Sequence, residues 1–309
     1  MNEQTRRKIQ DTYDLLSRDT DTADNPVSQR CRILGVFVPQ EGHSHADARC
    51  DAFLRDVQVM QDAAAAAGYG VLLGPYSGQG RTVADTMIDN QELAGVILLG
   101  SHIDDPIHQR LEVAEIPFIL VHRMIDNGPY HCIGIDDEQA TRDLTNYLLD
   151  KGYKSIGFLG GPEQRLPQQQ KKKGFLAALA DRGIEVNPDW IVNMQHAATE
   201  SAAREAAMQL LSQPDRPRAI LASTDGIAFG VLDAARGRGL DVPRDLAVAG
   251  FDDRDRAAYS TPPLTTIHVP WNEMARIATS QLIQLVEYGQ AIKKIQVCLT
   301  TRLVVRRSA

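Results

Sequence analysis

Short apolar runs recur along this chain of 309 residues, and each ends in a polar or glycine-rich tip. They lie at Gly35–Gln40, Gly70–Tyr76, Gly95–Ser101, Pro117–Arg123, Cys132–Asp137, Ser155–Pro162, Ala219–Asp225 and Leu246–Asp253. Uninterrupted apolar runs of this length are typical of strands buried on both faces of a parallel sheet. Segments with helical periodicity, such as Phe53–Ala67 and Arg142–Leu149, separate most of them. The alternation predicts doubly wound α/β structure.

The pattern divides into two halves, and the second closes with a strand at Leu264–His268. An amphipathic helix, Asn272–Glu287, and a last apolar run, Gln296–Val305, then remain. Because this helix and this run remain after two complete halves, we expect the chain to cross between two lobes more than once. We expect two doubly wound parallel-sheet lobes joined by hinge crossovers around a cleft. The expected division is 33–131 plus 269–292 for the N-terminal lobe and 132–268 plus 293–309 for the C-terminal lobe.

The residues before the first strand have a different composition. Residues 3–17 predict an amphipathic helix, with a thin apolar stripe of Ile9, Leu15 and Leu16. Residues 18–32 are rich in Asp, Thr, Ser and Asn around Pro26, which predicts a linker.

Ligands of doubly wound sheets bind beyond the carboxyl ends of the strands. We therefore expect the polar tips of the strands to converge on one crevice that holds a small polar molecule. These tips are Gln40, His122, Thr224, Asp225, Asp252 and Asp253.

Composition narrows the class of protein. The net charge is −7 and the isoelectric point is near 5.6, so the chain lacks the basic surplus of a nucleic-acid-binding module. No apolar stretch approaches the ~20 residues that span a membrane, and the N-terminus does not resemble a signal peptide. We therefore expect a cytoplasmic protein. Its four cysteines share no metal or redox spacing, which predicts free thiols.

Each motif has an alternative interpretation. The glycine-rich 157–162 could cradle a phosphate, but it lacks a dinucleotide or phosphate-loop spacing, and a glycine turn after a strand is favoured. His43, His45, Asp47 and Cys50 could bind metal, although surface loops often carry such residues by chance. The run 171–173 predicts a solvated helical start with one lysine free to face the crevice. Asp252-Asp253 could be a general acid/base pair, yet no nucleophile or histidine stands beside it in the sequence, which favours hydrogen bonding to a ligand.

Taken in order, the motifs resemble the lactose/galactose repressor (LacI/GalR) family of bacterial transcription regulators. They are Gly-Phe-Leu-Gly-Gly-Pro at 157–162, Lys-Lys-Gly-Phe-Leu-Ala-Ala-Leu at 172–179, Ala-Ser-Thr-Asp-Gly-Ile-Ala-Phe-Gly at 222–230, Val-Pro-Arg-Asp-Leu-Ala-Val-Ala-Gly-Phe-Asp-Asp at 242–253 and Thr-Pro-Pro-Leu-Thr-Thr-Ile at 261–267. The resemblance extends from about Ile33 to the last residue. It implies an effector-binding core with the type I fold of periplasmic sugar-binding proteins.

The resemblance also implies roles for particular residues. Asp252 matches a carboxylate that accepts hydrogen bonds from adjacent sugar hydroxyls. Thr224 replaces a usual asparagine, and Lys171 replaces an arginine that makes bidentate contacts. The other implied ligand-binding residues are His122 in place of an aspartate or asparagine, Arg165, the stacking aromatic Phe53, and Gln40 at its strand tip.

Family members place a helix-turn-helix head before this core, and residues 1–17 resemble its third helix. The first two helices of that head are not in this sequence, so we expect a start codon assigned too late or a truncated gene. Operator DNA is then an expected partner only if an upstream helix-turn-helix is restored. The resemblance further implies a homodimer in which effector binding shifts the N-terminal lobes.

Two other functions compete with a regulator. One is an exported or stand-alone sugar-binding protein of the same fold, and the other is a nucleotide-dependent α/β enzyme. The missing signal peptide and the third-helix resemblance disfavour the first, and the missing phosphate motifs disfavour the second. We expect no enzyme activity, cofactor, metal or membrane partner. Lys171 and Arg165 favour an anionic effector, a sugar phosphate or sugar acid, over a neutral sugar unless they pair with carboxylates such as Glu163.

Overall fold

The structure is a computed structural model that describes residues 32–39, 51–77, 82–101, 105–122, 129–194, 199–289 and 294–309, with the side chains of 51–55 left out. Arg32–Ala309 forms one compact unit. The expectations for the helix at 1–17, Gln40 and the candidate metal ligands of 43–50 lie outside the described residues, as does the linker at 18–32 except for Arg32.

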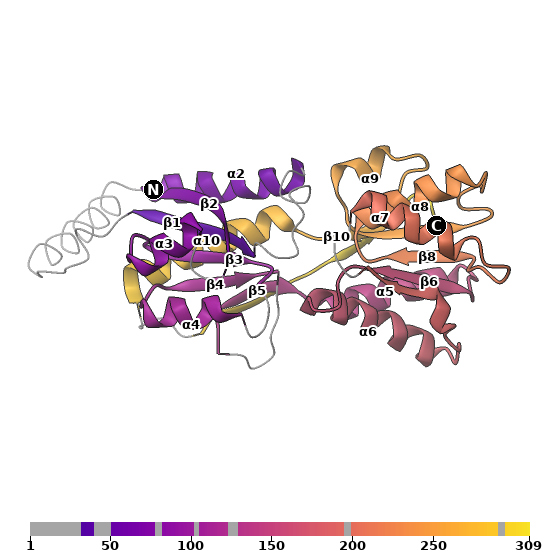
Figure 1. Cartoon of the computed structure of the whole chain (residues 1–309), viewed down its shortest axis with the longest axis horizontal. Coiled ribbons are helices and arrows are strands. Elements are labelled where there is room, and N and C mark those ends of the chain that lie inside the picture. Colours follow the sequence, from indigo (N-terminus) through magenta and orange to yellow (C-terminus); the bar gives the residue numbers. More distant parts are fainter. Residues whose placement is uncertain are drawn as a thin grey trace, which may run out of the picture. The chain divides into compact units, whose positions relative to one another are not determined.

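The first sheet has six parallel strands, of which Figure 1 labels β1 to β5. In spatial order they are β11 (Gln296–Leu299), β5 (Cys132–Ile135), β4 (Phe118–Val121), β3 (Gly95–Leu99), β1 (Ile33–Pro39) and β2 (Gly70–Tyr76).

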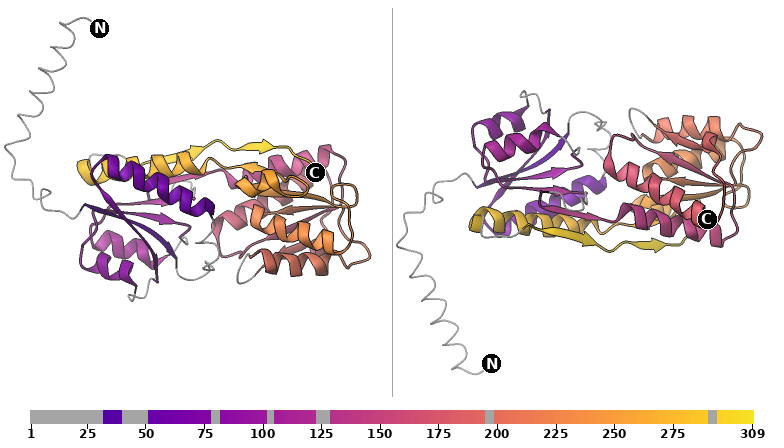
Figure 2. Two further views of the ribbon diagram at one scale, coloured as in Figure 1. Left: turned by 90° about the horizontal axis from the view of Figure 1, so that it is seen from above. Right: turned by 90° about the horizontal axis from the view of Figure 1, so that it is seen from below.

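Helices cover both faces of this sheet because its strands are apolar on both sides. One face packs against α2 (Asp51–Ala66) and α10 (Trp271–Tyr288), which lie side by side in Figure 2. The other face packs against α3 (Val83–Asp89) and α4 (Pro106–Val113). Alternate residues of β1 enter the two cores: Val36 joins the first, and Phe37 joins the second.

The second sheet also has six strands, in the order β12 (Arg302–Val304), β10 (Thr265–His268), β9 (Ala247–Asp252), β8 (Ala219–Ala222), β6 (Ile156–Gly160) and β7 (Ile191–Asn193). All neighbours run parallel except β10 and β12. One face packs against α5 (Asp137–Asp150) and α6 (Leu166–Asp181), and the other against α7 (Glu200–Leu210) and α8 (Asp225–Gly237). Two short elements complete this part, the 3-10 turn η3 (Pro188–Trp190) and α9 (Asp255–Tyr259).

The chain passes between the sheets three times, from β5 to α5, from β10 to α10 and from β11 to β12. The prediction of more than one crossover is therefore confirmed. The expected lobe boundary needs correction, because β5 and β11 pair with each other in the first sheet and not in the second. An apolar strand buried on both faces carries no mark in its sequence of the sheet that it joins.

Each of the eight apolar runs contains a strand, so the doubly wound pattern is confirmed. The short β7 has no predicted counterpart; its residues are only partly buried, and it is an edge strand. The last run, Gln296–Val305, holds two strands that belong to different sheets.

Gly174 of α6 marks a close approach between two helices. A Cβ atom at this position would overlap the carbonyl oxygen of Glu138 in α5, so only glycine lets the two backbones meet here. The contact matters for function because α5 and α6 carry Asp137 and Lys171, which are described below.

We expect Gly174→Ala to destabilise the fold by about 1–3 kcal/mol, because the methyl group has to push α5 away from α6. Gly237→Ala is a matched control in α8: its nearest neighbour would lie 4.0 Å away. That change should be neutral or stabilising by about 0.5–1 kcal/mol. Urea denaturation measures the change in the free energy of unfolding for each substitution. Equal changes for the two would contradict the close approach of α5 and α6.

Candidate functional site

The candidate site lies at the carboxyl edge of the second sheet. Here β8 leads into α8 through Ser223 and Thr224, and β9 ends at Asp252. The Thr224 hydroxyl caps α8 by accepting a hydrogen bond from the Ile227 N–H at 3.2 Å. The parallel strands thus bring polar groups from separate parts of the chain to one edge.

Lys171 is the buried cation of this edge, with a side chain only 6% exposed. Its Nζ lies 3.5 Å from Oδ1 of Asp137 and donates a hydrogen bond of 3.1 Å to the Ser223 carbonyl oxygen. The same ammonium lies 3.6 Å from the centre of the Phe251 ring, a cation–π contact. Its neighbours Lys172 and Lys173 pair instead with Glu163 and Glu138 near the surface. The run lies inside α6 and not at its start, and Lys171 is buried, so the expected solvated helical start needs correction. That one lysine of the run faces the crevice stays a prediction.

Asp225 is fully buried at the start of α8. Its Oδ1 accepts a hydrogen bond of 2.6 Å from the Thr266 hydroxyl, and its Oδ2 accepts one of 2.7 Å from the Arg254 N–H. A Cβ atom on Gly250 would overlap Oδ1, so this glycine makes room for the carboxyl group against β9. Asp225 therefore joins α8 to the strand that carries Asp252.

Burial raises the pKa of three acids at this edge, Asp225, Asp137 and Asp252. It raises the pKa of Asp225 to about 8, with the nearby Asp252 charge adding to the effect. It also raises the pKa of Asp137 to about 6, although Lys171 opposes the shift. Burial raises the pKa of Asp252 too, against the opposing charges of Lys171 and Arg254. Near neutral pH, Asp225 is therefore mostly a neutral acid, whereas Asp137 is mostly ionised and faces Lys171.

Asp252 and Asp253 have separate surroundings, although they are adjacent in sequence. Asp253 pairs with His268 at 2.9 Å and with Arg306 at 2.6 Å, which ties β9 to β10 and to the segment after β12. The Asp252 carboxylate accepts a hydrogen bond from the Asp225 N–H and lies 4.0 Å from Nε of Arg254. Both residues have a positive φ, 118° and 55°, which is uncommon outside glycine and concentrates at functional sites.

Arg254 links this edge to residues of the first sheet and its helices. Its guanidinium lies 4.8 Å from the centre of the Trp271 ring at the start of α10, and Nη1 lies 3.8 Å from Asp56 of α2. The ring of His122, just after β4, meets Trp271 edge-on at 4.2 Å, and His122 has a φ of 64°. A cavity of about 360 Å³ is lined by Asp56, Arg254 and Trp271, among others.

The structure brings some of the predicted residues together. Lys171, Asp252 and the Thr224 cap share one edge, and His122 reaches it through Trp271 and Arg254. Arg165 is the N-cap residue just before α6, and its side chain makes no capping hydrogen bond to the helix. The side chain of Phe53 and all of Gln40 lie outside the described residues.

Sequence reasoning missed three members of the site, Asp137, Arg254 and Trp271. Asp137 had a signal, since it ends the apolar run Cys132–Asp137. Arg254 lies two residues after β9 and Trp271 three residues after β10, so a wider search beyond the strand ends would have included them. Two buried polar atoms here, Ser223 Oγ and Trp271 Nε1, have no hydrogen-bond partner among the described residues.

The sequence also raised the questions of a phosphate-binding loop, a metal site and a membrane-spanning segment. Gly157–Gly160 lies in β6, and the Gly161 N–H donates to the Gln168 side chain at 2.9 Å, so 157–162 is a strand with its turn. In the described part of the chain, His, Cys, Asp and Glu side chains form no group of three or more able to hold a metal ion. Of the helices described, none has the length and apolarity to cross a membrane.

Comparisons with known proteins agree with the fold and with the order of the motifs. The model of the periplasmic binding protein-like domain matches residues 145–309. The HTH-type transcriptional repressor CytR of Escherichia coli (strain K12) is 32% identical over 290 residues, which cover 92% of this chain and 81% of that protein. Catabolite control protein A of Priestia megaterium is 27% identical over 279 residues, covering 89% of this chain and 81% of that one.

A solved structure gives the same result. The regulatory protein of the LacI family from Chloroflexus aggregans superposes with a TM-score of 0.76 at 27% identity, covering 89% of this chain and 98% of that chain. CytR is a transcriptional repressor, and the Chloroflexus aggregans protein is a regulatory protein of the LacI family. The identity to CytR over most of both chains and the domain match together show that this chain belongs to the LacI family of transcriptional regulators.

Proposed function

We propose that Arg32–Ala309 is the effector-binding and dimerisation core of a transcriptional repressor that acts on operator DNA in the cytoplasm. The observation that carries this proposal is the group formed by Lys171, Asp137, Asp225 and Asp252 at the carboxyl edge of the second sheet. The homology to HTH-type repressors supports the link to DNA. Residues 1–17 remain our candidate for the third helix of a DNA-binding head.

The charges of the site favour a neutral, sugar-like effector. The sequence favoured an anionic effector because Lys171 and Arg165 counted as two cations, with pairing to carboxylates as the alternative. Lys171 faces Asp137, and Glu163 is paired with Lys172, so the pairing involves a different carboxylate from the one expected. Because the Lys171 charge is matched within the protein, a further negative group on the ligand would face Asp252 and Asp137. Hydroxyl groups, by contrast, can donate to these carboxylates.

Within this group we assign the contact with the effector to Asp252 and a supporting role to Asp225. Asp225 is fully buried, and both of its oxygens are used by Thr266 and Arg254. Asp252 keeps a side chain that is 12% exposed, at a strand end where ligands bind in this class of fold. An effector that contacts Asp252 together with Trp271 or His122 would couple the second sheet to α10 and β4, and such coupling is the basis of an allosteric response.

The effector assignment is tested by a thermal-shift screen of neutral mono- and disaccharides, sugar phosphates and sugar acids. We expect a neutral sugar to raise the melting temperature, because a ligand that binds only the folded state stabilises it. Asp252→Asn should remove most of this shift, since an amide has one acceptor oxygen instead of two. Lys172→Gln, which breaks only a surface pair, should leave the shift unchanged.

A response confined to sugar phosphates or sugar acids would overturn the neutral-effector assignment while leaving the regulator proposal standing. A neutral-sugar response that persists in Asp252→Asn would overturn the role of Asp252.

The raised pKa of Asp225 makes a separate prediction about stability. A carboxyl group whose folded-state pKa is about 8 is easier to protonate in the folded state, so its contribution to stability is complete below its unfolded pKa near 4. That contribution falls as the pH rises from about 4 to about 8. Asp225→Asn is neutral throughout and can keep both hydrogen bonds, with its amide donating to Thr266. Between pH 5 and pH 8 we expect the free energy of unfolding of the wild type to fall by about 2 kcal/mol or more relative to that of this variant.

Urea denaturation at the two pH values measures this difference. Asp233→Asn, a substitution of a partly exposed carboxylate in the same helix, is the control. Its stability should change between the two pH values as that of the wild type does. If Asp225→Asn also followed wild type, Asp225 would be ionised in the fold throughout this range.

The dimer proposal rests on exposed apolar side chains as well as on homology. Tyr259 in α9 is 85% exposed and Val83 in α3 is 70% exposed, and a partner surface would cover them. We expect light scattering at micromolar concentration to give twice 34.0 kDa. Tyr259→Glu should raise the dissociation constant at least about tenfold, and Tyr259→Phe should not. A wild-type monomer at these concentrations would refute the proposal.

A further inference from the structure

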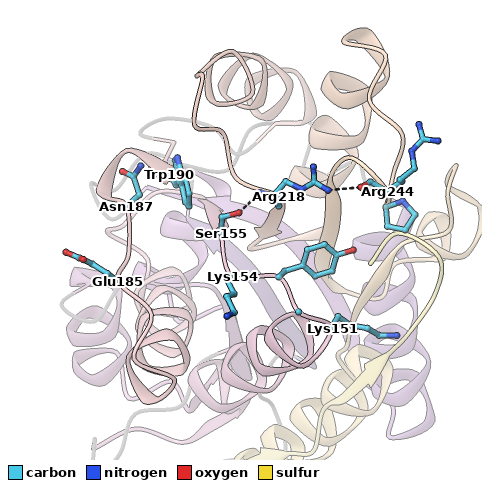
Figure 3. A pocket seen from close by; sticks show the side chains of 11 residues that line it. Lys151, Lys154, Ser155, Glu185, Asn187, Trp190, Arg218 and Arg244 are labelled. Atoms are coloured by element: carbon cyan, nitrogen blue, oxygen red, sulfur yellow. Dashed lines mark hydrogen bonds between the residues drawn. The ribbon is translucent and has the colours of Figure 1, made fainter.

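A second cavity lies at the amino edge of the second sheet, the edge opposite the site of Lys171. It has a volume of about 780 Å³ and is drawn in Figure 3. Its lining includes Ser155 and Arg218, the residues just before β6 and β8, whereas the carboxyl ends of β8 and β9 lead to the proposed effector site. A strand of five residues separates its two ends by roughly 15 Å, so this cavity is a different place from the effector site. We call it the basic cavity.

The lining of the basic cavity is cationic. Four of its side chains carry a positive charge, Lys151, Lys154, Arg218 and Arg244, and one carries a negative charge, Glu185. This local surplus stands out because the whole chain has a net charge of −7. A cluster of like charges in an otherwise acidic protein gains free energy when an anion binds between them.

The charges of the two lysines are not neutralised within the described residues. There, neither Lys151 nor Lys154 forms an ion pair, and Nζ of Lys151 lies 5.5 Å from the centre of the Tyr147 ring. Arg244, in contrast, reaches Asp241 at 3.4 Å and Asp245 at 3.5 Å. The two lysines and Arg218 are therefore the cations that we assign to a ligand.

Arg218 is held in place by the backbone around it. Its Nη2 donates to the Arg244 carbonyl oxygen at 3.0 Å, and its backbone N–H donates to the Ser155 hydroxyl at 3.2 Å. Figure 3 shows Arg218 and Ser155 in the middle of the lining, with Trp190 and Asn187 to one side and Arg244 to the other. A guanidinium fixed in this way presents its remaining N–H groups in a constant position, which suits the oxygens of a phosphate.

The lining also includes Tyr153, Trp190 and Pro243, which we call the aromatic wall. Two of these three residues carry aromatic rings on which a planar group can stack. The volume falls in the range of pockets that hold small molecules, about 300–1,000 Å³. The cavity thus combines a cationic part for phosphate groups with an aromatic part for a ring.

We propose that the basic cavity binds a nucleotide, with its phosphates at Lys151, Lys154 and Arg218 and its base against the aromatic wall. The charges select a molecule with two or more negative charges, and the wall selects one that carries a planar ring. This site is separate from the proposed effector site, and the proposal does not depend on which effector binds there.

The two tryptophans of the chain make a direct test possible, because Trp190 lines the basic cavity and Trp271 belongs to the effector site. In Trp271→Phe, the fluorescence of Trp190 alone reports on the cavity. We expect saturable quenching when ADP is added, weaker binding of adenosine, which lacks the phosphates, and weaker binding of inorganic phosphate, which lacks the ring. Calorimetric titration of the wild-type chain with ADP gives the same answer without any substitution.

Two variants of equal charge distinguish the site from general attraction to a positive surface. Lys154→Gln should weaken ADP binding at least about tenfold, as loss of a charge at a phosphate does. Lys173→Gln removes an exposed lysine of α6 outside the cavity and should leave ADP binding unchanged. Equal effects of the two substitutions, equal affinities for ADP and inorganic phosphate, or no saturable binding at concentrations up to about 10 mM would each overturn the proposal.

Discussion

The ammonium group of Lys171 lies inside the protein, where an unmatched charge has a high free energy. Its partners come from three different elements: Asp137 begins α5, Ser223 follows β8 and Phe251 belongs to β9. One side chain of α6 therefore fixes the positions of a helix and two strand ends. Removing one member of a buried ion pair costs about 3–5 kcal/mol, so this edge keeps its geometry only while all these partners are present.

The same charge balance shapes the chemistry that the site offers to a ligand. Two carboxyl groups, Asp137 and Asp252, interact with Lys171, and burial keeps a third, Asp225, largely protonated near neutral pH. Asp225 can then serve as a neutral link between α8, β9 and β10, while the Asp252 side chain stays 12% exposed at the end of β9. The strained backbone at Asp252 is supported by this arrangement, since its carboxylate is held by the Asp225 N–H.

The periodicity of the sequence was sufficient to predict the strands and the doubly wound class, because strands buried on both faces leave long apolar signals. It could not assign β5 or β11 to a sheet, since both read as ordinary buried strands. For the site, the strand ends indicated Asp252 and Thr224 correctly as neighbours at one edge. The pairing of Lys171 with Asp137 was hidden, because it depends on the close approach of α5 and α6 at Gly174. The role of Arg254 was hidden as well, because its partners Trp271 and Asp56 are distant in the sequence.

The two strands after residue 295 have a consequence for the order in which the protein forms during its synthesis. β11 completes the edge of the first sheet, and β12 completes the edge of the second. Residues 33–268 can therefore leave the ribosome with both sheets lacking an edge strand, and exposed strand edges are sites of wrong pairing and aggregation. The protection of both edges arrives together, within the nine residues from Gln296 to Val304. A ribosome that pauses before this segment would hold two incomplete sheets, which is a state that chaperones recognise.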